Sequence, residues 1–467
     1  MIQLEFYGAA QTVTGSMHLI HLPDGAVALD CGLFQGRRKW SREMNLSFPF
    51  PPRRLRTVLL SHAHIDHSGK IPHLFRYGFD GKIYATSATC DLCDLMLADS
   101  AHIQEEDAEY WNRRRAKTEA DRIEPLYTVE DAQAASHNFH GVRYNEPVEF
   151  ADGCTATFIE AGHILGSSCI LVEINRSPKI RLLYTGDLGR FDMPILRNPT
   201  NPLPEADYLI TESTYANRQH DDANGMQAAL VKIINETRHK GGKVIMPSFS
   251  VGRTQLLAYW LSQSIDDGML EPLPIFVDSP LSTRATRVFR DHPECYDEEA
   301  RDFWHEEGDV FGRGFVTYIT DVEKSKALNY LKEPCVIISA SGMCEAGRIL
   351  HHLKNNIENR RNTVVIVGYQ AQNTLGRRIV ERHEELKIYG QMYRLRARVE
   401  ILNGFSAHAD SDDFVRLFAP IAPKLKGAFA VHGEDEQVES MKEILRKAGC
   451  RNVHAPSAGQ RFPLEEY

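Results

Sequence analysis

The residues of this sequence best suited to chemistry form a dense cluster of potential metal ligands. His62, His64, Asp66 and His67 follow the apolar run Val58–Leu60, so the cluster begins where an expected strand ends. Imidazole nitrogens and carboxylate oxygens are ligands that zinc takes in hydrolases. One ion cannot easily use all these groups, but a loop can direct His62 and His64 to one ion and Asp66 and His67 to another. The cluster therefore predicts a metal site with room for two ions.

Two further candidate ligands lie downstream, each at the end of an expected strand. They are His163, in the segment 161–167, and Asp187, which closes the segment 184–187. Taken alone, each has a plain structural alternative, but zinc in a hydrolase needs more ligands than the cluster supplies to either ion. Asp30 ends another strand and could orient the ligand histidines through a hydrogen bond.

Patterns of apolar residues predict the elements that position these side chains. About the first 200 residues show short β-rich runs, typical of a layered sheet domain; they are Gln3–Tyr7, Ala26–Leu29, Thr57–Leu60, Lys82–Tyr84, Thr155–Ile159, Cys169–Ile174 and Arg181–Tyr184. Residues 87–135 are helical in pattern and heavily charged, which is typical of an exposed helical excursion.

A second pattern begins near residue 207 and continues to about residue 391. Each buried-strand run there is followed by a helix, which predicts a parallel sheet wrapped by helices. The runs are Tyr208–Thr211, Lys243–Pro247, Pro274–Val277, Cys335–Ser339 and Thr363–Val367. After Val399–Leu402, a last unit that includes Ala428–His432 adds more strand and helix.

Length and composition set the broad class of the protein. The chain has 467 residues, of which 42% are hydrophobic and 25% charged, and this favours a globular protein of two domains. No basic, apolar leader opens the sequence and no apolar run approaches the roughly 20 residues of a membrane span, so we expect neither export nor membrane insertion. The nine scattered cysteines indicate free thiols in a reducing cytoplasm.

The charge of the chain limits how it could hold nucleic acid. A net charge of −9 argues against a basic surface over the whole molecule. A local basic surface stays open as an alternative. Its candidate residues are Arg253, Arg284, Arg287, Arg348, Arg377 and Arg378.

In their order along the chain, these candidate ligands resemble those of the metallo-β-lactamase superfamily, an α/β class with a four-layer αββα fold and a binuclear metal site. The resemblance implies two zinc ions. It implies that His62, His64 and His163 hold one of them, and that Asp66 and His67 hold the other. Asp187 would bridge both ions, and Asp30 would lie behind the ligands.

Three segments further along are similar to motifs A, B and C of the β-CASP nucleases, a branch of that superfamily. They are Thr211–Tyr215, Gly404–Asp410 and Val431–Glu434. The likeness is to the endonuclease subunit of the cleavage and polyadenylation specificity factor and its bacterial relatives. It implies a parallel-sheet β-CASP domain inserted into the metallo-β-lactamase domain, with a cleft between them for single-stranded RNA. The implied boundaries are 1–208 and 395–467 for the metallo-β-lactamase domain and 209–394 for the insertion.

The resemblance also implies a mechanism. Two zinc ions about 3.5–4 Å apart can share a hydroxide whose parent water has a pKa lowered toward about 7. Asp66 would orient this nucleophile, and His408 would protonate the leaving 3′-oxygen with Glu212 holding its ring. His432 would complete the second zinc shell, and a histidine in motif C is typical of members that act on RNA.

Other functions stay open at this stage. A small-molecule metallohydrolase would use the same ligands, a DNA-acting nuclease would use the same chemistry, and a non-catalytic scaffold would bind RNA without cutting it. Motif A departs mildly from many relatives, since Ala216-Asn217-Arg218 follows Tyr215 where glycine is common, and this concerns substrate fit. Whether the protein forms a homodimer is left open.

Overall fold

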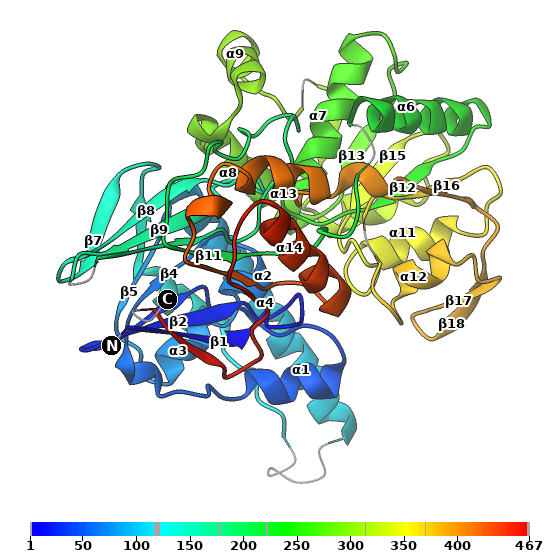
Figure 1. The fold of residues 1–467 in the computed structure, drawn as a ribbon. Helices are drawn as coiled ribbons and strands as arrows, with labels where there is room; N and C mark the ends of the chain where they lie inside the picture. Colours follow the sequence, from blue (N-terminus) through cyan, green and yellow to red (C-terminus); the bar gives the residue numbers. More distant parts are fainter. Residues whose placement is uncertain are drawn as a thin grey trace. The chain divides into compact units, whose positions relative to one another are not determined.

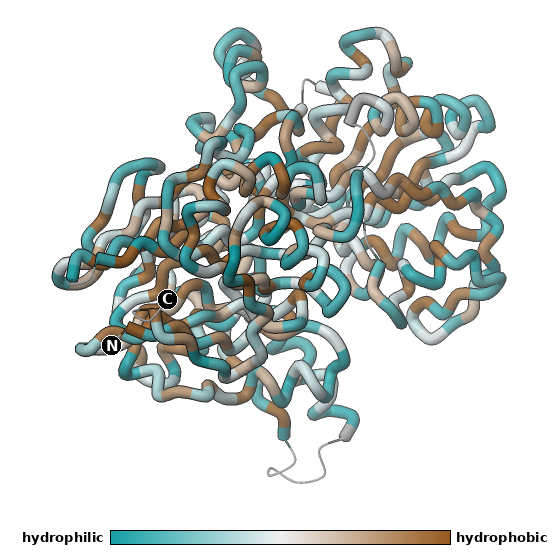
Figure 2. The backbone as a smooth tube through the Cα atoms, in the orientation of Figure 1, coloured by the Kyte–Doolittle hydropathy of each residue, from teal (hydrophilic) through white to brown (hydrophobic). Residues whose placement is uncertain are grey.

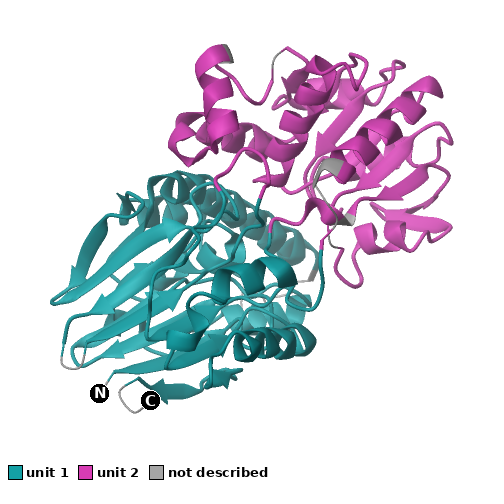
Figure 3. Ribbon diagram, turned by 45° about the horizontal axis from the view of Figure 1, so that its top comes forward, with its two compact units in different colours: residues 1–191, 198–219, 408–467 teal, residues 192–197, 220–407 magenta. Residues whose placement is uncertain are grey.

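The computed structural model describes residues 2–115, 122–176, 179–220, 223–312, 314–368 and 370–464. The chain divides into two compact units, coloured separately in Figure 3. Unit 1 contains residues 1–191, 198–219 and 408–467, and unit 2 contains residues 192–197 and 220–407. The expected domain boundaries, near residues 208 and 394, stay a prediction beside this division.

Unit 1 is built on two seven-stranded sheets (Figure 1). The first has the order β22 (Arg461–Pro463), β1 (Gln3–Gly8), β2 (Met17–Leu22), β3 (Gly25–Leu29), β4 (Leu55–Leu59), β5 (Lys82–Thr86) and β6 (Phe139–Val142). The second has the order β21 (Val453–His454), β20 (Gly427–Ala430), β11 (Tyr208–Thr211), β10 (Ile180–Tyr184), β9 (Ser168–Ile174), β8 (Cys154–Glu160) and β7 (Pro147–Ala151).

A hydrophobic core joins the two sheets of unit 1. Side chains alternate along a strand, so one face of each sheet can be apolar. Fully buried residues from both sheets share one cluster, among them Leu4, Phe6, Val27, Leu59, Phe158, Ile170, Leu182, Ile210 and Phe429. Burial of each such side chain stabilises the fold by about 1.5–3 kcal/mol. In Figure 2 the hydrophobic colour gathers on strands and the hydrophilic colour on outer helices and loops.

Helices cover the outer faces of the sheets. On the first sheet, α4 (Ser87–Arg115) packs on β5, β6 and α5 (Val129–Ser136). On the second, α13 (Ser411–Phe418) and α14 (Asp435–Lys447) bury Phe414 and Met441 against Leu183 and Leu209 of the strands. The layers are therefore helix, sheet, sheet and helix, which confirms the predicted αββα arrangement. Three shorter helices of this unit are α1 (Arg38–Asn45), α2 (Ile65–Ser68) and α3 (Ile71–Arg76).

Unit 2 contains a parallel sheet wrapped by helices, which confirms the predicted strand and helix alternation. Its order is β14 (Val316–Tyr318), β13 (Ile275–Val277), β15 (Val336–Ser339), β12 (Val244–Pro247), β16 (Thr363–Ile366) and β19 (Arg398–Ile401). Its helices are α6 (Ala223–His239), α7 (Arg253–Asp266), α8 (Pro280–Asp291), α9 (Glu298–Glu307), α10 (Val322–Leu328), α11 (Ile349–Asn356) and α12 (Leu375–Val380). A hairpin of β17 (Glu385–Ile388) and β18 (Gln391–Arg394) completes the unit.

Two expected strands lie in a different unit from the one that their neighbours in the sequence indicated. Tyr208–Thr211 was grouped with the strands of the inserted section, but β11 lies between β10 and β20 and pairs in parallel with both. Val399–Leu402 was expected in the final segment, but β19 pairs in parallel with β16 of unit 2. A buried apolar strand carries no local signal for its sheet, because pairing partners far along the chain decide it.

The ends of the chain close unit 1, since β20 and β21 extend the second sheet and β22 pairs with β1 of the first. Among the described residues, no helix combines the length and the apolar character that crossing a bilayer requires.

Candidate active site

The loop after β4 carries the predicted ligand cluster to one end of the first sheet of unit 1. Strand β4 ends at Leu59, and His62 and His64 follow in the loop. Helix α2 begins at Ile65, so Asp66 and His67 lie in its single turn. A strand end followed at once by a tight helical turn thus presents the four side chains within a short stretch of backbone.

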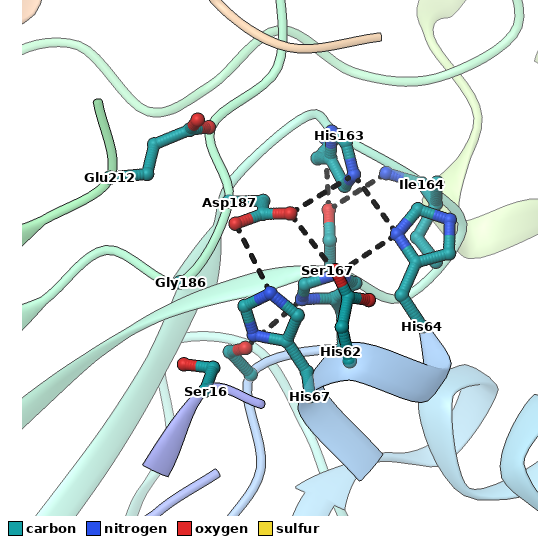
Figure 4. A network of polar contacts seen from close by, with 12 residues as sticks. Ser16, His62, His64, His67, His163, Ile164, Ser167, Gly186, Asp187 and Glu212 are labelled. Atoms are coloured by element: carbon teal, nitrogen blue, oxygen red, sulfur yellow. Dashed lines mark hydrogen bonds and ion pairs between the residues drawn. The ribbon is translucent and has the colours of Figure 1, made fainter. Parts of the chain in front are cut away.

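The first ligand group contains His62, His64, His163 and Asp187 (Figure 4). His62 Nε2 lies 3.1 Å from His64 Nδ1, and His163 Nε2 lies 3.3 Å from the same His64 atom. Asp187 Oδ2 lies 3.5 Å from His62 Nε2 and 3.7 Å from His163 Nε2. Four ligand atoms therefore converge on one small volume.

The second ligand group contains Asp66, His67 and His432. His67 Nε2 lies 3.2 Å from His432 Nε2, which in turn lies 3.6 Å from Asp66 Oδ2. His432 follows β20, so the last part of the chain supplies this ligand from the second sheet.

Asp187 faces both groups with different oxygens. Its Oδ2 belongs to the first group, while its Oδ1 lies 3.3 Å from His67 Nε2 of the second. This Oδ1 is buried and, among the described residues, accepts no hydrogen bond. The preceding Gly186 has φ +54°, and a Cβ there would lie 2.5 Å from Cβ of Ser61, so glycine is required for this close approach.

The geometry of the donors fits zinc. Zn–N bonds are about 2.0–2.1 Å, so adjacent ligand atoms of a tetrahedral site lie about 3.3 Å apart. The nitrogen–nitrogen separations of 3.1, 3.3 and 3.2 Å match that edge. The two ligand groups therefore have donor types and spacings that fit metal binding, and Asp187 faces both groups.

Burial sets the protonation of the histidines. Burial lowers the pKa of His62 well below its ordinary value and lowers the pKa of His64 to about 4, so both rings are neutral, as metal ligands must be. For His67, burial is opposed by Asp187 and Asp30, and these carboxylates raise its pKa well above the ordinary value. Burial opposes the charged form of Asp66, but His432 and the other nearby histidines outweigh it and lower its pKa to about 2.

Asp30 lies behind the ligands, fully buried, as the sequence predicted. Its Oδ2 accepts hydrogen bonds from His67 Nδ1 at 2.6 Å and from Tyr184 Oη at 2.6 Å. Its Oδ1 accepts the backbone N–H of Ser61 at 2.7 Å. Asp30 has φ +60° and His432 has φ +51°, left-handed conformations that cost non-glycine residues on the order of 1 kcal/mol and that recur at functional sites.

His408 and Glu212 form a third group beside Asp187. His408 Nδ1 lies 3.1 Å from Glu212 Oε2 and 3.9 Å from Asp187 Oδ2. Glu212 is held in turn, because its Oε1 accepts the backbone N–H of Leu188 at 2.6 Å. Burial opposes the charged ring of His408, but Glu212 and Asp187 outweigh it and raise its pKa to about 9. The two carboxylates therefore favour the protonated form of the His408 ring.

Every site residue predicted from the sequence lies in unit 1 and within this network, while their individual roles stay proposals. The sequence analysis missed Thr214, whose Oγ1 lies 3.2 Å from His432 Nδ1, and Ser167, whose Oγ accepts the backbone N–H of His163 at 2.9 Å. It also gave no role to Tyr184. All three stand inside quoted motifs, which is the signal that could have identified them.

The arginines considered for a local basic surface lie in unit 2, and two of them have partners inside the protein. Arg348 Nη1 donates to Asp278 Oδ1 at 2.7 Å, and Arg253 donates to the carbonyl of Val367. A local basic surface built from these residues stays a prediction.

Three known domains match successive parts of the chain. A metallo-beta-lactamase superfamily domain matches residues 19–188, a Beta-Casp domain matches residues 254–379, and a Zn-dependent metallo-hydrolase RNA specificity domain matches residues 392–456. A crystal structure of a protein of unknown function from Enterococcus faecalis V583 has a TM-score of 0.56 at 12% identity, over 99% of both chains, and shows the fold alone.

Similar proteins extend over nearly the whole chain. Ribonuclease TTHA0252 from Thermus thermophilus is 33% identical over 98% of this chain and 99% of its own length. An RNase J-like protein from Methanocaldococcus jannaschii is 30% identical over 99% of this chain and 100% of its own length. Transcription termination factor FttA from the same organism is 29% identical over 97% of this chain and 70% of its own length. The chain therefore belongs to the metallo-β-lactamase superfamily and, within it, to the metal-dependent β-CASP ribonucleases.

Proposed function

We propose that this chain cuts RNA internally by hydrolysing phosphodiester bonds with two zinc ions. His62, His64 and His163 would hold the first ion, Asp66, His67 and His432 would hold the second, and Asp187 would serve both. The observation that carries this proposal is the position of Asp187, whose Oδ2 faces one ligand group and whose Oδ1 faces the other.

Asp66 orients the attacking water. When bound, two zinc ions lower the pKa of a water molecule toward about 7 and neutralise negative charge that develops on the attacked phosphate. The pKa of Asp66 lies at about 2, so its carboxylate is ionised at working pH and can accept a hydrogen bond from that water. Asp66 thereby fixes the direction of attack while also serving as a ligand.

His408 is the acid that completes the reaction. Attack on the phosphorus breaks the bond to the 3′-oxygen, and this oxygen takes a proton from the His408 ring, which leaves a 5′-phosphate on the other product. Glu212, 3.1 Å from His408 Nδ1, orients the ring and favours its protonated form. We assign the delivered proton to Nε2, because Nδ1 is the ring nitrogen that faces Glu212.

RNA is the substrate that the chain favours over DNA. Position 432 is a histidine, as in RNA-acting members by the analogy drawn from motif C, and two of the relatives carry ribonuclease names. The match to an RNA specificity domain at residues 392–456 supports the same choice.

The direct test incubates the zinc-loaded protein with end-labelled single-stranded RNA and with DNA of the same sequence. We expect internal cuts in RNA, products with a 5′-phosphate, and loss of cleavage in His408→Ala and Asp66→Ala. His305→Ala, an exposed histidine of unit 2, serves as the matched control and should cut normally.

Three outcomes would redirect the proposal. Cleavage of DNA alone would indicate a DNA-acting nuclease, RNA bound but not cut would indicate a scaffold, and activity only on small esters or thioesters would indicate a small-molecule hydrolase. Loss of activity in His305→Ala would mean that histidine substitution damages the folded protein in general, so the losses in the site variants could not be assigned to the site.

Location and assembly belong to the same proposal. All nine cysteines are free, as expected for a reducing cytoplasm, and we propose that the enzyme works there. A homodimer and a cleft between the domains as the RNA path stay predictions from the resemblance.

A further inference from the structure

The segment after motif A lies directly beside the proposed acid His408. Residues 213–218 form successive turns, in which the backbone N–H of Ala216 donates to Ser213 and that of Arg218 donates to Tyr215. The Tyr215 ring centroid lies 5.9 Å from that of His408, with 40° between the ring planes. This segment therefore lies beside the ring of the proposed acid.

Arg218 lies on the same tyrosine ring. Its guanidinium carbon is 4.9 Å from the Tyr215 ring centroid, a cation–π contact. Its carbonyl accepts the backbone N–H of Ser411 at 3.1 Å, which fixes the end of the segment to the start of α13. The backbone of Arg218 is thus held, while its side chain is exposed.

The guanidinium of Arg218 stands apart from the ion pairs found among the described residues. Within the described residues, no carboxylate lies within ion-pair distance of it, although the neighbouring site is rich in Asp and Glu. Arg348 and Arg290, in contrast, are paired with Asp278 and Asp309. A planar cation that is placed by a ring and left unpaired suits a phosphate oxygen, which it can bind through two parallel hydrogen bonds.

The position of Arg218 selects one phosphate of the substrate. His408 protonates the 3′-oxygen that leaves, and this oxygen belongs to the nucleotide on the 5′ side of the cut. Arg218 and His408 share the Tyr215 ring as a neighbour, which places the guanidinium near the acid that protonates this leaving group. We propose that Arg218 binds the phosphate at the 5′ end of the leaving nucleotide, one linkage upstream of the cut. This inference rests on the proposed ribonuclease function.

The test removes the phosphate charge and the arginine charge separately and then together. RNA substrates carry a neutral methylphosphonate at one linkage at a time, and kcat/KM at a single mapped cut is measured for the wild type and Arg218→Ala. We expect the neutral linkage directly upstream of the leaving nucleotide to lower the wild-type value about tenfold, as loss of one charge-assisted hydrogen-bond pair would. In Arg218→Ala the same neutral linkage should change kcat/KM by less than about twofold. The reason is that the charged phosphate has already lost its arginine partner in this variant, so the effects of the two changes are not independent.

Arg416→Ala is the matched control. Arg416 is also exposed and also lies over an aromatic ring, with its guanidinium carbon 3.7 Å from the Phe191 centroid. Among the described residues, none of its hydrogen bonds, ion pairs or ring contacts joins it to the proposed site. This variant should keep the wild-type response to every linkage. Arg218→Lys keeps the charge and should retain part of the response, and zinc content with circular dichroism should show Arg218→Ala folded and loaded.

The outcomes separate the two proposals. If the wild type cuts unmodified RNA but Arg218→Ala keeps its full sensitivity to the upstream linkage, the Arg218 inference is wrong and the ribonuclease proposal stands. If Arg218→Ala instead removes the sensitivity to a neutral group at a different linkage, Arg218 binds a different phosphate and the inference is also wrong. If the wild type cuts no RNA, both proposals fail.

Discussion

Asp30 Oδ2 lies 2.6 Å from Nδ1 of His67, so the ring is held by the nitrogen that points away from the ligand group. This leaves Nε2 to face His432 at 3.2 Å and Asp187 at 3.3 Å. Because Asp30 is fully buried and also accepts from Ser61 and Tyr184, its position is fixed by four hydrogen bonds to three residues. The orientation of a ligand in helix α2 is therefore set by a carboxylate that follows strand β3.

The substitution Asp30→Asn should weaken metal binding. An amide can accept fewer of these hydrogen bonds and brings an N–H toward donors, so His67 loses its fixed orientation. Loss of such an orienting partner typically costs about 10–100-fold in metal affinity. Competition with a fluorescent zinc chelator measures the change. Asp152→Asn, at an exposed position, should match the wild type, and an unchanged affinity in Asp30→Asn would show that Asp30 has no orienting role.

Single-ligand variants should separate the two metal positions. His163 belongs only to the first ligand group and His432 only to the second, so His163→Ala and His432→Ala should each retain about one zinc ion per chain. Asp187→Ala should weaken both positions, because one oxygen of Asp187 faces each group. Elemental mass spectrometry after gel filtration gives the count, with His305→Ala as the control. Retention of both ions in His163→Ala would contradict the assignment of that ligand.

The parts of this site that the sequence predicts are those concentrated in short motifs. His62, His64, Asp66 and His67 occupy one loop, and the end of the preceding strand could be read from its apolar residues. The contact between Thr214 and His432 joins positions 218 residues apart, and no local pattern encodes it. It arises because β11 and β20 pair in parallel, which brings the loops after both strands to the same end of the sheet.

The stability of unit 1 should depend on the titration of Asp413. Burial, with the charge of Asp410 adding to it, raises the pKa of Asp413 to about 6, above its ordinary value of 3.8. The native state therefore binds this proton more tightly than the unfolded state does. The protonated Asp413 side chain therefore contributes to the stability of the folded state below about pH 4, and this contribution is lost as the pH rises through 6. We therefore compare the free energy of unfolding of Asp413→Asn with that of the wild type. Relative to the wild type, the variant should become more stable by on the order of 1 kcal/mol when the pH rises from 4.5 to 7.5, after allowance for solvent screening.

Urea unfolding of both proteins at the two pH values measures this difference. The asparagine can still accept the backbone N–H of Asp410, so the start of α13 is kept. Asp412→Asn changes an exposed neighbouring carboxylate and should show no such pH dependence. A wild-type and Asp413→Asn difference that is the same at both pH values would exclude a raised pKa for Asp413.

The leaving group decides whether His408 acts as an acid. Ribose 3′-oxygen is a poor leaving group and needs a proton, whereas nitrophenolate leaves without one. His408→Ala should therefore lower kcat/KM on RNA by at least about 100-fold but lower it on bis(p-nitrophenyl) phosphate by less than about tenfold. Glu212→Gln should show the same selectivity to a smaller degree, because Glu212 acts through the His408 ring. Asp66→Ala should impair both substrates, since every attack needs an oriented water. Equal losses on both substrates in His408→Ala would assign that residue to binding or metal positioning instead of proton transfer.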